Sequence, residues 1–265
     1  LFVSLVTIIC GIALCNYLFY SVDNDGEDPF KKAKPWEAAT FKWSYPNEVW
    51  DVYEADEALS LVKKHFEDME EAGIERTIGG DWRLEGPANI GGRFNAIAVD
   101  PFDENNMLAG SCAGGLFITN DGGDNWNPVT DDMAWMAMGS IVYHPEEEGV
   151  VYLGTGDPQI SSHPRLGSGV WRSTDGGDNW EHLGLDSARI VSKLLILDDE
   201  PNIIMAGTMG NPAISGPDRG LYRSTDSGDS WTQVLLPSDS AGINDIAYDP
   251  STGIMIATGW NRLRN

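Results

Sequence analysis

The stretch STDGGDNW at residues 173–180 decides the fold of this chain, because its pattern occurs three times. TNDGGDNW at 119–126 is the first copy, and STDSGDSW at 224–231 is the third. The copies begin 54 residues apart (173 − 119) and then 51 residues apart (224 − 173). A near-constant period of this length is typical of a repeat architecture.

Each copy is predicted to form a hairpin turn. A Ser or Thr ends an apolar run, an Asp accepts hydrogen bonds from backbone amides of the turn, Gly supplies a positive φ, and Trp begins the next strand. The conspicuous carboxylates are therefore interpreted as structural, because the turn itself needs an acceptor at that position. The structural residues expected in the three turns are Asp121, Trp126, Asp175, Trp180, Asp226 and Trp231.

Short β-branched and aromatic runs recur around the turns, and Pro, Gly and Asp separate them. They indicate four strands in each unit of about fifty residues, which is typical of propeller blades. The predicted fold is an all-β propeller with three four-stranded blades between about Arg93 and Pro237. A fourth blade begins near Ile243 and has two strands before the sequence ends. Since a propeller closes with at least four blades, we expect this sequence to be a fragment of a longer chain.

The Ser/Thr-x-Asp-x-Gly-x-x-Trp turns resemble the Asp-box (BNR) repeats of sialidases, sortilin-type receptors and xyloglucan-cleaving glycosidases. The segment GPANIGGR at 86–93 resembles secreted bacterial Asp-box propellers of the sortilin-like group. The resemblance covers residues 81–265. It implies that the turns lie on the face opposite the ligand site, and it specifies the fold more closely than the function.

Composition restricts the partners. The 265 residues carry a net charge of −24, so nucleic acid is excluded as a partner by like-charge repulsion. Three Cys and four His are present, and Cys112 is the one Cys within the repeats. No disulfide framework, metal site or cofactor is expected, because neither a metal-spaced cluster nor a phosphate-binding loop is evident.

The N-terminus is expected to direct export. Residues 1–22 are almost entirely apolar and are interpreted as a signal peptide or membrane anchor, with lipidation at Cys15 as an alternative. The protein is therefore expected at an extracellular, periplasmic or cell-surface location, with membrane contact only through this segment. Residues 23–80 form an extension, in which a helix near 54–72 is predicted to pack on the propeller at 81–265 through the apolar residues Leu59, Val62, Phe66 and Met69.

Long loops at 130–138, 157–168 and 209–219 are predicted to lie on the face opposite the turns. Long loops on a rigid scaffold are where binding residues concentrate. The candidate ligand-contact residues are Trp135, Asp157, His163, Arg165, Asn211, Asp218 and Arg219.

Two classes of function remain open. Sialidases have Phe/Tyr-Arg-Ile-Pro before the first box, and Gly92-Arg93-Phe94-Asn95 lacks the Ile-Pro. The xyloglucan-cleaving relatives have a catalytic Asp before a Gly pair, where this chain has Cys112. Asp157 is a remaining carboxylate without an identifiable partner, and no catalytic residue is assigned. The sequence favours a secreted or surface propeller that binds a protein or glycan or acts as a scaffold, with a glycoside hydrolase of the Asp-box type as the alternative.

Overall fold

The computed structural model describes residues 92–261, apart from 132, 134, 160–164 and 213, and also part of 57–73. The predicted leader at 1–22, with Cys15, lies outside the described residues, as does most of the extension. That division into domains stays a prediction. No helix among the described residues is long and apolar enough to cross a membrane.

The predicted helix is present in the part of 54–72 that the structure describes, since each described residue between 57 and 71 is helical. Gly73 follows with a φ of 66°, a left-handed conformation that commonly ends helices. Leu59 and Phe66 of the expected apolar stripe lie outside the described residues, and Val62 is exposed. Packing of this helix on the propeller therefore remains a prediction.

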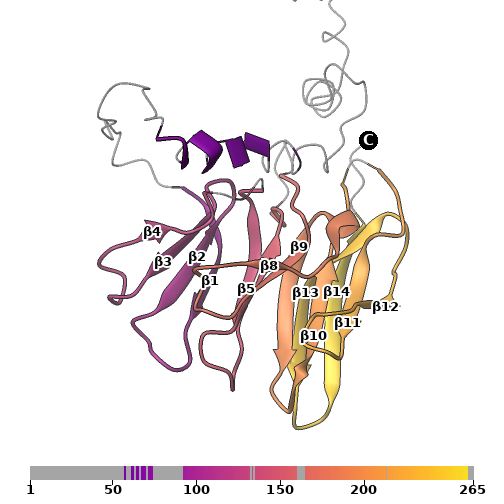
Figure 1. Ribbon diagram of the computed structural model, residues 1–265. Coiled ribbons are helices and arrows are strands. Elements are labelled where there is room, and N and C mark those ends of the chain that lie inside the picture. The colour runs from indigo at the N-terminus through magenta and orange to yellow at the C-terminus, as the bar shows by residue number, and fades with distance from the viewer. Residues whose placement is uncertain are drawn as a thin grey trace, which may run out of the picture. The chain divides into compact units, whose positions relative to one another are not determined.

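The described strands form three four-stranded antiparallel sheets and one antiparallel pair (Figure 1). Blade 1 consists of β1 (Phe94–Val99), β2 (Met107–Ser111), β3 (Leu116–Thr119) and β4 (Asn127–Pro128). Blade 2 consists of β5 (Met138–Tyr143), β6 (Val151–Thr155), β7 (Val170–Ser173) and β8 (Glu181–His182). Blade 3 consists of β9 (Val191–Leu197), β10 (Glu200–Thr208), β11 (Gly220–Ser224) and β12 (Thr232–Leu235). The terminal pair is β13 (Ala241–Asp249) and β14 (Ile254–Asn261).

The three repeated stretches, hereafter the repeat turns, each join the third strand of a blade to the fourth. In the middle copy the Ser173 hydroxyl donates to Asp175 Oδ1 at 2.7 Å and accepts from the Gly177 amide at 2.9 Å. Asp175 Oδ1 also accepts from the Asn179 amide at 2.9 Å, and Trp180 Nε1 donates to the Gly177 carbonyl at 2.9 Å. The hydrogen bonds of the Ser/Thr and Asp side chains recur in both other copies. In each copy these bonds join residues within one stretch of eight.

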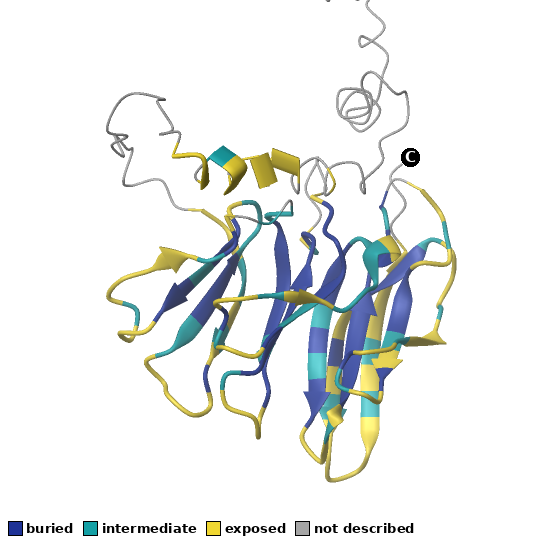
Figure 2. Ribbon diagram, in the orientation of Figure 1, coloured by how far each residue is buried: buried dark blue, intermediate teal, exposed yellow. Residues whose placement is uncertain are grey.

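Neighbouring blades pack face to face through apolar side chains, and the strands hold most of the buried residues (Figure 2). One cluster joins blade 1 to blade 2 through residues such as Leu108 and Ile141. A second cluster joins blade 2 to blade 3 through Tyr152 and Leu194, and a third joins blade 3 to the terminal pair through Met205 and Ile246. The predicted all-β propeller of four-stranded blades is confirmed.

A short 3-10 helix, η1 (Asp186–Ala188), lies between β8 and β9. Leu185 and Arg189 flank it with φ values of 63° and 57°, which non-glycine residues seldom adopt. The sequence does not predict this element, because three residues without a repeat or a turn motif carry too weak a signal.

Candidate functional site on the loop face

Antiparallel pairing separates the connections into two faces. The connections from first to second strand and from third to fourth strand share one end of each blade, and this end is called the turn face. The Gly122 amide of a repeat turn donates to the carbonyl of Asn105, between β1 and β2, at 3.1 Å. The other connections form the opposite end, called the loop face, which holds the loops at 156–169 and 209–219.

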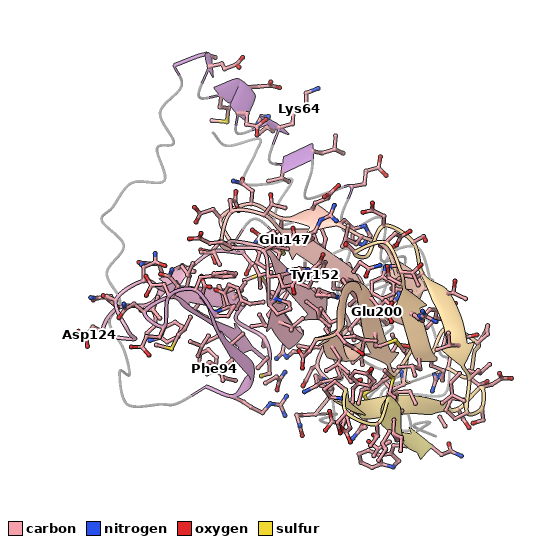
Figure 3. All side chains as sticks on the ribbon, turned by 90° about the horizontal axis from the view of Figure 1, so that it is seen from below. Lys64, Phe94, Asp124, Glu147, Tyr152 and Glu200 are labelled. Carbon is pink, nitrogen blue, oxygen red and sulfur yellow. The ribbon has the colours of Figure 1, made fainter. Side chains whose placement is uncertain are left out.

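Charge is divided between these two faces. In the described residues, the connections on the turn face contain many Asp and Glu residues and neither Lys nor Arg. Figure 3 shows the molecule from below the view of Figure 1 and labels two of these residues, Asp124 and Glu147, and also Glu200 at the start of β10. The described arginines outside the strands lie on the loop face at Arg93, Arg165, Arg189 and Arg219. The same connections also carry the carboxylates Asp131, Asp157, Asp186, Asp218 and Asp239, so the described loop face holds both signs of charge whereas the turn face is acidic.

A buried carboxylate connects blades 1 and 2 on the loop face. Asp157 follows β6 and forms an ion pair with Arg93, which directly precedes β1. Its other carboxylate oxygen accepts from Asn95 Nδ2 at 3.2 Å and from the Gln159 amide at 3.1 Å. Asn95 Nδ2 also donates to the carbonyl of Met138 at 2.9 Å. Strand ends from two blades thus converge on one carboxylate.

The two partners of this ion pair differ in exposure. The Asp157 side chain is 1% exposed, whereas the Arg93 side chain is 41% exposed. Burial alone would lower the pKa of Arg93, but the Asp157 carboxylate and a hydrogen bond with Cys112 outweigh it and raise that pKa. Arg93 also donates to the Gln159 carbonyl at 3.3 Å. The guanidinium is therefore permanently charged, held in place, and accessible from one side.

Arg219 organises the loop between β10 and β11. Its buried guanidinium donates to the carbonyls of Asn211 and Ile214, each at 2.6 Å. Gln233 Nε2 supports the same loop through the carbonyls of Pro217 and Arg219 at 2.7 Å and 2.8 Å. Burial lowers the pKa of Arg219 despite the nearby charges of Asp239 and Asp218. The buried Arg219 side chain thus stabilises the loop to which it belongs.

The remaining predicted contact residues are spread over the loop face. Arg165 and Asp218 are exposed, and Trp135 and Asn211 are half-buried. His163 lies outside the described residues. The structure thus brings Asp157 together with Arg93 and Asn95, which were not among the predicted site residues, and it separates Asp157 and Arg219 into different loops. Arg93 could have been found from the sequence, because it ends the GPANIGGR segment. Its partner Asp157, however, lies 64 residues further along the chain.

The carboxylates of the repeat turns lie on the turn face and are strongly hydrogen-bonded. Side-chain and backbone donors at Asn125, Asn179 and Ser230 lower the pKa of Asp121, Asp175 and Asp226 to about 2. A carboxylate that accepts several hydrogen bonds is stabilised in its charged form. These groups are therefore ionised acceptors of the turns.

The described loop face offers the exposed guanidinium of Arg93 as a donor and the exposed carboxylates of Asp131, Asp218 and Asp239 as acceptors. Glycoside hydrolysis uses two carboxyl groups that flank the glycosidic bond. Asp157 is enclosed by donors, and the sulfur of Cys112 occupies the position that the xyloglucan-cleaving resemblance assigns to a catalytic Asp. Within the described ranges, no group of three or more His, Cys, Asp or Glu side chains could hold a metal ion.

No protein-family model matches the chain. A probable oligoxyloglucan-reducing end-specific xyloglucanase of Neosartorya fischeri is 30% identical over 141 residues, which cover 51% of this chain and 16% of that protein. A xyloglucanase of a Paenibacillus species is 25% identical over 180 residues, which cover 62% of this chain and 17% of that protein. This chain therefore spans less than a fifth of the length of either curated relative.

Among solved structures, an ancestral GH74 enzyme matches with a TM-score of 0.51 at 23% identity, over 63% of this chain and 22% of that chain. This likeness agrees with the β-propeller fold of the described residues. The named curated relatives are glycoside hydrolases, which favours the alternative interpretation of the sequence, a glycoside hydrolase of the Asp-box type, over the main one, a protein- or glycan-binding or scaffold module.

Proposed function

We propose that this chain is part of an exported glycoside-hydrolase-type propeller that binds a glycan on its loop face. The observation that carries the proposal is the Arg93 guanidinium, fixed by buried Asp157 while 41% of its side chain stays exposed. A preorganised donor loses little freedom when it binds a ligand. Sugar hydroxyl oxygens are suitable acceptors for such a donor.

The finer family assignment is also part of the proposal. The hydrogen bonds of the repeat turns support membership of the Asp-box group, because Ser/Thr and Asp perform the same task in all three copies. The xyloglucanase relatives support a β-glucan of the xyloglucan type as the first ligand to examine. Export is supported by the apolar residues 1–22, and we propose the signal-peptide interpretation for them.

Calorimetric titration of xyloglucan oligosaccharides into the full chain tests glycan binding. We expect Arg93→Gln to weaken binding at least tenfold, because it removes the charged donor. Arg223→Gln is the matched control, since Arg223 is an exposed arginine on β11 away from the loop-face connections. Equal affinity in both variants would assign the ligand to another surface, and no binding by the unaltered chain across a panel of neutral and acidic glycans would overturn the proposal.

Hydrolysis is a second candidate, and the names of the curated relatives favour it. Release of reducing sugar from xyloglucan and other β-glucans measures it directly. The contacts of Asp157 predict that Asp157→Asn raises KM, through loss of the Arg93 position, with a small effect on kcat. A fall in kcat of more than a hundredfold at unchanged KM would instead make Asp157 a catalytic carboxylate. Binding without sugar release would leave recognition as the function.

A further inference from the structure

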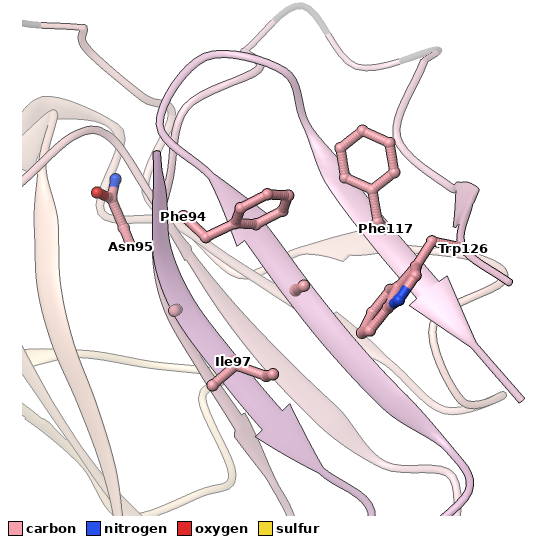
Figure 4. A pocket seen from close by; sticks show the side chains of 7 residues that line it. Phe94, Asn95, Ile97, Phe117 and Trp126 are labelled. Carbon is pink, nitrogen blue, oxygen red and sulfur yellow. The ribbon is translucent and has the colours of Figure 1, made fainter. Parts of the chain in front are cut away.

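The connection between β6 and β7 holds Asp157, the buried partner of Arg93. The structure describes residues 156–159 and 165–169 of this connection, and we call these residues the site connection. The Asp157 carboxylate also accepts from Asn95 Nδ2 at 3.2 Å, and Asn95 is one of the residues around the hollow shown in Figure 4. The place of the site connection therefore determines where the Arg93 guanidinium is held.

The two described ends of the site connection are in direct contact. The Asp157 amide donates to the carbonyl of Arg165 at 2.8 Å. Gly167 passes so close to Gly156 that a β-carbon on Gly167 would collide with the Gly156 amide. Ser168 follows directly and is 3% exposed. A shift of Ser168 is therefore passed on to Asp157.

His182 of β8 holds the C-terminal end of the site connection. Its Nε2 donates to the carbonyl of Ser168 at 2.7 Å. The ring of Trp171 lies against the His182 ring with centroids 4.7 Å apart, and Trp171 Nε1 donates to Ser168 Oγ at 3.1 Å. Two side chains in contact with each other thus hold the same buried serine.

The same nitrogen of His182 faces a carboxylate. His182 Nε2 lies 3.1 Å from Asp186 Oδ1 in η1, and the two side chains are 33% and 30% exposed. Burial alone would raise the pKa of Asp186, but its hydrogen bond and charge interaction with His182 and the charge of Arg189 outweigh burial and lower that pKa. Only a protonated imidazole carries the charge that makes this contact an ion pair.

The backbone around η1 is hydrogen-bonded to the site connection and to the start of β7. Leu185 and Arg189 have positive φ values, and non-glycine residues keep this conformation only where their surroundings hold them. The Arg189 carbonyl accepts from the Gly167 amide at 2.6 Å. The Val170 amide donates to the carbonyl of Gly184 at 2.9 Å. Asp186 is therefore held beside His182 by backbone contacts that do not titrate.

A second ion pair lies next to His182 on β8. Glu181 precedes His182 and pairs with Arg172 of β7 at 2.8 Å. The Arg172 side chain also bonds to Asp229 at 3.2 Å, in the repeat turn of blade 3. The carboxylate of Glu181 is therefore already paired with a permanent charge, whereas the pairing of Asp186 with His182 depends on protonation.

We propose that His182 is a pH-dependent positioning residue of the loop-face site, whose protonation draws Ser168 and η1 together and fixes the site connection with the Arg93 guanidinium. An imidazole ordinarily titrates near pH ~6.5, so the effect is expected between about pH 5.5 and pH 7.5. Charge-assisted hydrogen bonds are the stronger ones, so the site connection is held more firmly at the lower pH. The consequence for glycan affinity rests on the proposed function.

Hydrogen exchange of the Gly167 and Ser168 amides, measured on the full chain without ligand, tests the proposal. After correction for the intrinsic effect of pH, we expect exchange to be about two- to fivefold slower at about pH 5.5 than at about pH 7.5, the range for a partly exposed ion pair. His182→Gln keeps a donor for Ser168 but cannot become charged, and Asp186→Asn keeps the histidine but removes its ion-pair partner. Each change should abolish the difference, and a full difference in either folded variant would overturn the proposal.

Two other histidines serve as controls for His182. His65→Gln is the matched change at an exposed histidine within the helical residues 57–71, and it should leave the difference intact. His163→Gln examines the histidine of the β6–β7 connection that lies outside the described residues. Loss of the difference in His163→Gln, or its absence from the unaltered chain, would overturn the assignment to His182.

Glycan titration separates this inference from the proposed function. Xyloglucan oligosaccharides should bind with a Kd about two- to fivefold lower at about pH 5.5 than at about pH 7.5, and His182→Gln should remove this dependence. Binding with the same Kd at both pH values would overturn the coupling of His182 to Arg93. Absence of glycan binding at both pH values would overturn the proposed function, and the exchange rates would still decide the role of His182.

Discussion

The Asp157 carboxylate in blade 2 is buried against the guanidinium of Arg93 at the start of blade 1, and this is an ion pair between two blades on the loop face. One carboxylate oxygen serves Arg93 and the other serves Asn95 and Gln159. The pair fixes the boundary between the blades at the place where we propose that a glycan binds.

Replacing Asp157 by Asn should destabilise the chain by about 2 kcal/mol, because hydrogen bonds to a charged group contribute about 1.5–3 kcal/mol each. An amide also turns one acceptor oxygen into a donor, which then faces either Arg93 or the donors at Asn95 and Gln159. Urea unfolding monitored by tryptophan fluorescence gives the change in midpoint. Asp131→Asn, at an exposed carboxylate of the loop face, is the control. Equal midpoints for the two variants would contradict this role of Asp157.

Acid should weaken the repeat turns between about pH 4 and pH 2. The pKa of Asp175 is lowered from 3.8 to about 2 in the folded chain. Its contribution to stability is therefore complete above pH 4 and is lost as the pH falls through the folded value. Thermal unfolding from pH 2 to pH 6 measures this slope, which should be shallower in Asp175→Asn than in the control Asp178→Asn, whose side chain is exposed. Identical slopes would show that the turn carboxylate does not control acid stability.

Tyr152 should contribute a hydrogen bond between blades 2 and 3. Its buried side chain donates from the hydroxyl to the carbonyl of Ser227, in the next repeat turn, at 3.1 Å. Tyr152→Phe removes this bond and should cost about 1 kcal/mol. Tyr248→Phe is the comparison, since its hydroxyl bonds to Asp199 at an exposed position and water can replace the partner. Guanidinium unfolding that ranks Tyr248→Phe as the costlier change would contradict the interpretation.

Gly139 on β5 should not tolerate a side chain. A β-carbon there would collide with the carbonyl oxygen of Val191 in blade 3 and would lie 2.8 Å from that of Gly156. Gly139→Ala should therefore destabilise the chain by about 2 kcal/mol, within the usual range for overpacking. Gly92→Ala provides the control, because a β-carbon there meets nothing within 4 Å. Similar melting temperatures for the two variants would show that blades 2 and 3 separate easily.

The fold could be predicted from the sequence because the repeat turns are stabilised by contacts between residues close together in the chain. Ser173, Asp175, Gly177 and Trp180 satisfy one another within eight residues, so the pattern in the sequence is the structure of the turn. Its near-constant period indicated a repeat, the short apolar runs around each copy indicated four strands in each blade, and the Asp-box resemblance implied the face on which the turns lie.

The candidate site was only partly readable. Asp157 was identified from its place in a long loop, but its ion pair with Arg93 joins residues 64 apart, and the sequence carries no mark of that contact. Arg219 was expected to face a ligand and is buried, because the path of its loop brings two carbonyls to its guanidinium.

By itself, therefore, the sequence determined the repeat, the turn chemistry and the all-β propeller, since each depends on hydrogen bonds and apolar contacts between residues near one another in the chain. Only the tertiary structure decided which carboxylate is enclosed and which arginine stays exposed. Those properties depend on what the neighbouring blade places against a side chain, and blades meet through residues that are distant in sequence.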